Sequence, residues 1–265
     1  MSFPGIPFTG YYPADPNLAV GPNDIVEIVN LTIAVYGKDG QLKFAQRLDG
    51  PNGFFASVNG SYYMTDTKVF YDKESERYFA IVLDVPGAYT TDIKESYFCI
   101  AVSPVGSGLG TWTKHRINNL LTVGSVQFWT DYPGFGYDTD TVAITANMFE
   151  VAGGAGYAGA AVYTMAKADL EGTSGVTYTQ FLDSNAGTIQ PTRGSGGDAT
   201  DIYALAADTG SSNVLAVYHI GATLEKTTVT VPDYMPPSWS IISRAGEMEG
   251  IDGRILNTEY RFGHI

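Results

Sequence analysis

The sequence predicts an all-β protein, most simply a five-bladed β-propeller, on three observations. Short segments rich in β-branched and aromatic residues recur along the chain, with Gly-, Asp- and Asn-containing turns between them. No stretch of about 11 residues or more keeps the helical spacing of apolar side chains. A segment in which an aspartate opens a strand, followed by a turn and a second strand, recurs at intervals of 51, 65 and 121 residues, which correspond to one, one and two blades of about 50–65 residues.

The expected strands cover the chain from end to end. In order they are 25–30, 31–36, 68–71, 77–83, 97–102, 111–116, 141–146, 159–165, 176–181, 202–207, 214–219, 227–231 and 254–262. Residues 160–170 come nearest to a helical pattern, but their flanks favour a strand followed by a turn. A β-sandwich is the alternative fold, and it ranks second because it would not usually repeat at this period.

We expect the repeats to form blades at about 13–48, 62–116, 129–183, 189–231 and 239–265, the last one incomplete. An N-terminal strand could complete it, but Pro4 and Pro7 cannot donate to a ladder. Residues 235–249 are the other source of a missing strand, although Pro236 and Pro237 weaken that option. An open edge there would recruit a partner chain or a second copy.

Composition excludes several classes of function. The 265 residues contain 44% hydrophobic and 16% charged residues and carry a formal net charge of −13, which disfavours nucleic acid and anionic membranes as partners. No apolar run is long enough to span a bilayer. The single cysteine, Cys99, lies in an apolar strand and is expected to be buried and inert. The first residues show no signal peptide, yet the acidic, Tyr- and Gly-rich, almost cysteine-free composition favours an extracellular location.

Several segments resemble one family. DPNLAVGPNDIVEIVNLTIAVY at 15–36 is similar to the opening of large secreted bacterial exoproteins of unassigned function, and the segments at 66–81, 98–115, 131–149 and 252–263 look like later blades of that family. The resemblance implies a propeller fold and no established chemistry.

The repeated aspartates are the first candidate site, because repeat symmetry would gather them near one axis. Clustered carboxylates raise one another's pKa, and a hard cation such as Ca²⁺, an arginine or backbone N–H groups would relieve the repulsion. The candidate metal ligands are Asp15, Asp66, Asp131 and Asp252. The alternative is that each aspartate only caps its own turn.

Two kinds of side chain near the aspartates are candidates for ligand binding. Arg193 and Arg254 could pair with the aspartates or bind a ligand carboxylate, and Trp129 and Tyr132 flank Asp131 as a sugar platform would. Ordinary ion pairs and packing between blades are the competing explanations. The three histidines are isolated in sequence, and neither a GxSxG elbow nor a phosphate-binding loop occurs.

These residues support two functions. The first is an extracellular binding or structural module that recognises a polysaccharide, a glycoprotein or a neighbouring subunit, with an acidic channel able to hold a cation. The second is a glycoside hydrolase, because Ala14-Asp15-Pro16 resembles the A-D-P segment of five-bladed propellers of the glycoside hydrolase family 43 type. That resemblance implies Asp15 as general base, Asp131 as an orienting carboxylate, and Glu259 or Asp66 as the acid.

Overall fold

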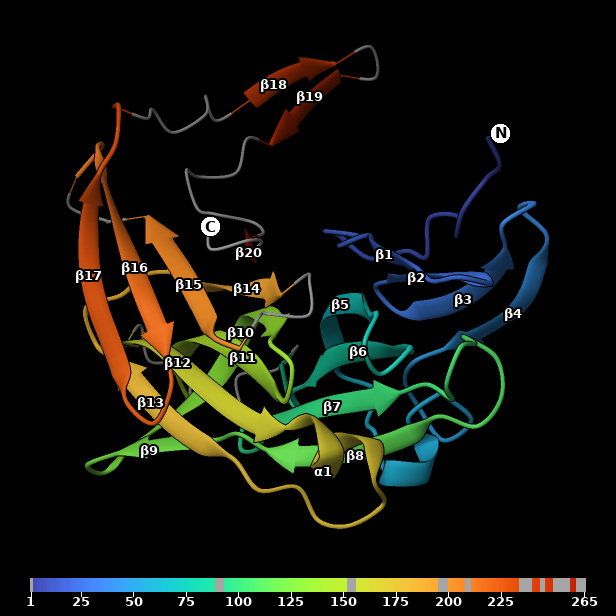
Figure 1. Ribbon diagram of the computed structural model, residues 1–265, viewed down its shortest axis with the longest axis horizontal. Helices are drawn as coiled ribbons and strands as arrows, with labels where there is room; N and C mark the ends of the chain where they lie inside the picture. Colours follow the sequence, from blue (N-terminus) through green and yellow to red (C-terminus); the bar gives the residue numbers. More distant parts are fainter. Residues whose placement is uncertain are drawn as a thin grey trace.

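The protein is all-β, apart from one short α-helix and one 3₁₀ turn in the part of the chain described here. The computed structural model describes residues 2–88, 93–151, 156–194, 200–207, 211–233, 240–243, 246–249 and 258–260. Four antiparallel meanders follow one another along the chain, each with four consecutive strands. Figure 1 shows the first strand of each meander nearest the centre of the molecule and the fourth strand at the periphery.

The strands of the first two meanders form two separate sheets. The first sheet consists of β1 (Asn17–Val20), β2 (Asp24–Val29), β3 (Thr32–Gly37) and β4 (Leu42–Arg47). After the 3₁₀ turn η1 (Ala56–Val58), the second consists of β5 (Met64–Asp72), β6 (Arg77–Asp84), β7 (Tyr97–Val102) and β8 (Thr113–Asn118).

The third and fourth meanders are joined into one larger sheet. The third consists of β10 (Val126–Tyr137), β11 (Thr141–Glu150), β12 (Tyr157–Ala166) and β13 (Thr179–Asp183), with β9 (Leu121–Val123) beside β10 and α1 (Lys167–Glu171) after β12. The fourth consists of β14 (Gln190–Gly194), β15 (Ile202–Ala207), β16 (Val214–Ile220) and β17 (Leu224–Thr230). The last strands are β18 (Ser240–Ser243), β19 (Gly246–Glu249) and β20 (Thr258–Tyr260).

First strands of neighbouring meanders lie side by side. Tyr137 of β10 is the parallel partner of Arg193 in β14, and β20 pairs in parallel with β14 on its other side. A glycine makes this approach possible, because a Cβ at Gly136 would lie only 2.3 Å from the carbonyl oxygen of Thr192. Asn17 Oδ1 likewise accepts a hydrogen bond of 2.9 Å from the backbone N–H of Val69 and so links β1 to β5.

Apolar side chains fill the space between successive meanders. In β6, Phe79, Ile81 and Leu83 face the core shared with the third meander. Tyr78, Ala80 and Val82 alternate with them and face the core shared with the first. A third core lies between the third and fourth meanders. Both faces of the second meander are therefore covered, which explains the continuous apolar run of β6.

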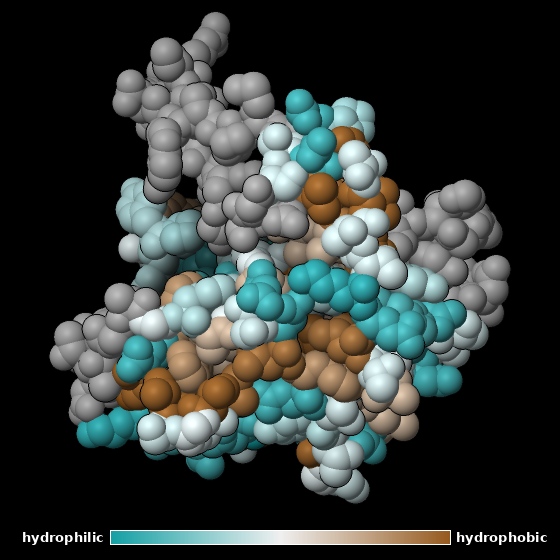
Figure 2. All heavy atoms as spheres, turned by 90° about the vertical axis from the view of Figure 1, so that its left-hand side faces the viewer, coloured by the Kyte–Doolittle hydropathy of each residue, from teal (hydrophilic) through white to brown (hydrophobic). Residues whose placement is uncertain are grey.

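The outer strands are more polar than the inner ones. In β17 every residue after Leu224 is exposed. On the side of the molecule that carries this strand, hydrophilic spheres are interspersed with hydrophobic ones (Figure 2). No helix of the described residues is long and apolar enough to cross a membrane.

Cys99 is fully buried in β7, as predicted. Burial raises the pKa of its thiol well above the ordinary value, and the nearby carboxylate of Asp84 acts in the same direction. Its slow reaction with thiol reagents stays a prediction.

Candidate functional site

Three of the repeated aspartates meet where β1, β5 and β10 come together. Asp15 lies two residues before β1, whereas Asp66 and Asp131 lie at irregularities in the ladders of β5 and β10. The φ angles are +45° at Asp15, +56° at Asp66 and +48° at Tyr132. Such local distortions re-aim side chains, and aspartate adopts this left-handed backbone more readily than most residues.

The three carboxyl groups form a continuous chain, which we call the central cluster. The side chain of Asp66 is hydrogen-bonded to that of Asp15 and also to that of Asp131. Asn30 Nδ2 donates to Asp15 Oδ2 over 2.7 Å, and the backbone N–H of Tyr132 donates to Asp66 Oδ2 over 2.9 Å. The expected convergence of Asp15, Asp66 and Asp131 is therefore found.

A bond between two carboxyl groups needs a proton on one of them. Burial raises the pKa of Asp66 to about 6, and the charge of Asp131 contributes to the same shift. Burial, followed by the charge of Asp66, raises the pKa of Asp15. The protonated form of Asp66 is therefore favoured up to a pH of about 6, and the negative charge of the central cluster increases as the pH rises past that value.

A lysine that the sequence analysis missed also belongs to this region. Lys68 interacts electrostatically with Asp15 and Asp66, and its ammonium lies 5.1 Å from the centre of the Tyr132 ring. Burial lowers the pKa of Lys68, and the like charge of Arg193 adds to the effect. Lys68 follows Asp66 by only two residues, but the register shift between Thr65 and Lys68 interrupts the regular alternation of side chains, so the sequence pattern did not reveal it.

Some candidates fall outside what the structure describes. Asp252 and Arg254 lie outside the described residues, and so does the side chain of Glu259, although its backbone in β20 is paired with Arg193. Among the described residues, no three His, Cys, Asp or Glu side chains are grouped so that they could hold a metal ion. A calcium site that includes Asp252 stays a prediction.

The geometry of the central cluster bears on the hydrolase hypothesis. An acid and a base that cleave a glycoside stand about 5–5.5 Å apart for retention and about 6.5–9.5 Å apart for inversion. Asp15 and Asp66 are instead hydrogen-bonded to each other, so no sugar fits between them. A hydrolase using Asp15 as base would therefore need Glu259 as its acid.

Trp129 belongs to a row of aromatic rings that crosses three strands. Trp129 of β10 is the register partner of Phe149 in β11, which in turn pairs with Tyr157 of β12. Their ring centres are separated by 5.8 Å and 5.2 Å, and Tyr157 is 43% exposed. We call these three residues the aromatic row. Sequence reasoning missed Phe149 and Tyr157, because only the strand register brings them beside Trp129.

Polar groups border the aromatic row. Asp131 is the register partner of Asn147, two residues from Trp129 and Phe149 respectively, and therefore on the same face of the sheet. The Tyr157 hydroxyl donates to the backbone oxygen of Ala186 over 3.0 Å and lies 3.3 Å from Asn147 Oδ1. The row thus combines ring surface with a carboxylate and an amide.

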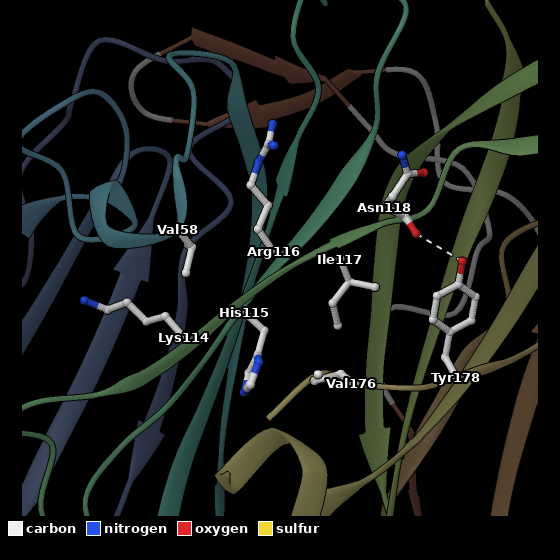
Figure 3. A pocket seen from close by; sticks show the side chains of 9 residues that line it. Val58, Lys114, His115, Arg116, Ile117, Asn118, Val176 and Tyr178 are labelled. Atoms are coloured by element: carbon white, nitrogen blue, oxygen red, sulfur yellow. Dashed lines mark hydrogen bonds between the residues drawn. The ribbon is translucent and has the colours of Figure 1, made fainter. Parts of the chain in front are cut away.

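A groove of 540 Å³ lies along β8, at the edge of the second meander. Its lining residues are Val58, Lys114, His115, Arg116, Ile117, Asn118, Gly175, Val176 and Tyr178 (Figure 3). We call it the β8 groove. The sequence analysis did not predict it, because its walls come from three segments that are distant in sequence.

No protein-family model matches the chain, and no curated protein matches it in sequence.

Proposed function

We propose that the chain is a β-propeller and that its four meanders are blades. Three features support this arrangement: the meanders follow one another around a centre, their first strands lie innermost, and a separate apolar core fills each space between successive meanders (Figure 1). A β-sandwich would have one interior between two sheets. Strands β18 to β20 would then belong to the fifth blade.

We further propose that this propeller is an extracellular binding module for a polysaccharide. The aromatic row is the observation that carries this proposal. Three adjacent, partly exposed rings offer the electron-rich faces on which the C–H groups of a sugar stack, and Asp131 lies on the same face of the sheet. Asn147 is buried and hydrogen-bonded to Thr188 and Tyr157, so it supports the row from within the protein.

The central cluster supports binding over catalysis. Carboxyl groups that are hydrogen-bonded to one another join the first strands of three blades and leave no room for a sugar between Asp15 and Asp66. Glycoside hydrolysis with Asp15 and Glu259 remains the second candidate function, on the resemblance of residues 14–16 alone.

Glycan arrays and affinity electrophoresis in polysaccharide gels, combined with a reducing-sugar assay, test the proposal. The protein should bind a glycan without releasing reducing ends. Trp129→Ala should weaken binding about ten-fold, as expected for a central aromatic anchor. The matched control is Tyr12→Ala, which removes a ring that is 89% exposed and lies outside the aromatic row.

Other outcomes would contradict the proposal. If Trp129→Ala and Tyr12→Ala are retarded equally in the polysaccharide gels, the aromatic row is not the glycan-binding site. Sugar release that Asp15→Asn abolishes would establish the hydrolase instead. A protein that binds no glycan at all would show that the ligand is not a carbohydrate.

A further inference from the structure

The outer edge of β8 has main-chain groups available for pairing. The backbone N–H of Asn119 is bonded to the oxygen of Ser96, which continues the ladder between β7 and β8. Because bonded and non-bonded pairs alternate in an antiparallel ladder, Lys114 and Arg116 direct their N–H and C=O groups away from β7. Among the described residues, none is hydrogen-bonded to these groups.

Charged side chains often protect such an edge by extending into solvent, but the two cations of β8 are held back against the protein. The Lys114 ammonium lies 3.9 Å from the centre of the Phe54 ring. The Arg116 guanidinium covers the Tyr97 ring at 3.4 Å and donates to the buried carboxylate of Asp84 over 2.7 Å. The backbone edge between them therefore stays accessible.

The segment after α1 forms one wall of the β8 groove and is fixed at both ends. His115 Nε2 is hydrogen-bonded to the oxygen of Leu170 over 2.9 Å, and the Tyr178 hydroxyl donates to the oxygen of Asn118 over 3.1 Å (Figure 3). Between these anchors, a Cβ added to Gly175 would meet no atom within 4 Å. Val58 of η1 lies across the groove. An extended chain could thus lie between two preformed walls.

The charge of the groove indicates which charge a bound peptide would carry. Lys114 is half-buried, and burial lowers the pKa of its ammonium. In the described part of the chain it forms no ion pair, although the whole protein has a net charge of −13. An incoming carboxylate would supply the missing counter-charge at a partly desolvated position.

We propose that the β8 groove binds an extended, acidic peptide segment of a partner protein by β-strand addition. The segment pairs with the outward N–H and C=O groups of Lys114 and Arg116 and places a glutamate or aspartate beside the Lys114 ammonium. This site is separate from the aromatic row, so the proposal does not depend on carbohydrate binding.

The test uses an N-acetylated, C-amidated hexapeptide, Thr-Glu-Val-Glu-Val-Thr, titrated into ¹⁵N-labelled protein. The amide protons of Lys114 and Arg116 should exchange more slowly with solvent in the complex, because they become hydrogen-bonded. Lys114→Gln should weaken binding about three- to five-fold, the upper part of the range for one partly exposed charge pair. The matched control Lys38→Gln removes an exposed lysine of the β3–β4 turn and should leave the affinity unchanged.

Two further probes decide between strand pairing and simple charge attraction. The same peptide with N-methyl groups on alternate amides keeps its charges but cannot complete the ladder, and we expect it not to bind. Equal binding of the methylated peptide, full displacement by acetate, or unchanged exchange at Lys114 and Arg116 at saturation would each overturn the proposal. Equal binding of a peptide with lysine in place of glutamate would overturn its acidic specificity.

Discussion

Asp66 is the residue that connects the other two carboxyl groups of the central cluster. It is hydrogen-bonded to Asp15 and Asp131, and it accepts a bond from the backbone of Tyr132. Lys68 offsets part of the negative charge, but burial still raises the pKa of Asp66 to about 6. The direction of this shift means that the ionised form of Asp66 destabilises the folded protein.

Replacing Asp66 should therefore change how stability depends on pH. The folded pKa of about 6 is higher than the 3.8 of an ordinary aspartate, so the folded state binds more protons and wild-type stability falls as pH rises through this interval. Asp66→Asn cannot ionise. The difference in free energy of unfolding between Asp66→Asn and the wild type should shift in favour of the variant as the pH rises from 4 to 7. The expected shift is on the order of 1 kcal/mol after solvent screening.

Urea unfolding at several pH values measures this difference. Asp140→Asn is the control, because Asp140 is exposed and lies outside the central cluster. A difference between Asp66→Asn and wild type that stays constant from pH 4 to 7 would show that Asp66 does not titrate in this interval.

At the scale of the elements, a buried ion pair joins the second and third meanders. Lys167 Nζ, at the start of α1, lies 2.8 Å from Asp72 Oδ2, at the end of β5, and both side chains are buried. Asp72 also accepts a hydrogen bond of 2.7 Å from the hydroxyl of Ser75. The carboxylate is thus satisfied from its own turn and from the neighbouring meander.

Removing the lysine should destabilise the protein strongly. Lys167→Met leaves the buried carboxylate of Asp72 without its cation, and the loss of one partner of a buried pair costs about 3–5 kcal/mol. Lys226→Met is the matched control, since Lys226 pairs with Asp183 at 2.9 Å but is 38% exposed, and its loss should cost about 0.5 kcal/mol. Chemical unfolding at pH 7 compares the two variants, and similar losses would contradict this role of the buried pair.

The elements also show which features the sequence could predict. Expected strands at 97–102 and 202–207 coincide with β7 and β15, because continuous or alternating apolar runs specify them. Strand β10 was not among the predicted strands, since Pro133 and Gly134 interrupt its pattern, and in the structure this interruption is a register shift within the strand. The repeat predicted the meeting of Asp15, Asp66 and Asp131, whereas the aromatic row and the β8 groove depend on register and on distant segments.

At the scale of the whole molecule, the second meander lies between two cores and so couples its neighbours. One core joins it to the first meander and contains Trp112, whose ring is 5.5 Å from that of Phe54. The other joins it to the third meander, where Trp129 packs against its margin. The pair between Lys167 and Asp72 reinforces the second contact. Loss of either interface would expose apolar surface on both sides.

The first three meanders should consequently unfold as one cooperative unit. Two double variants each keep a single tryptophan as a fluorescent probe. Trp112→Phe combined with Trp239→Phe keeps Trp129, and Trp129→Phe combined with Trp239→Phe keeps Trp112. Because both tryptophans border the second meander, their fluorescence should follow urea transitions whose midpoints agree within about 0.2 M and coincide with loss of the far-ultraviolet circular dichroism signal. Each midpoint is compared with the circular dichroism transition of the same variant, so that the effect of the substitutions themselves cancels. Separate transitions, with the Trp112 signal lost at a different urea concentration from the Trp129 signal, would mean that the meanders behave as a linear array with weak interfaces, in which each unit melts by itself.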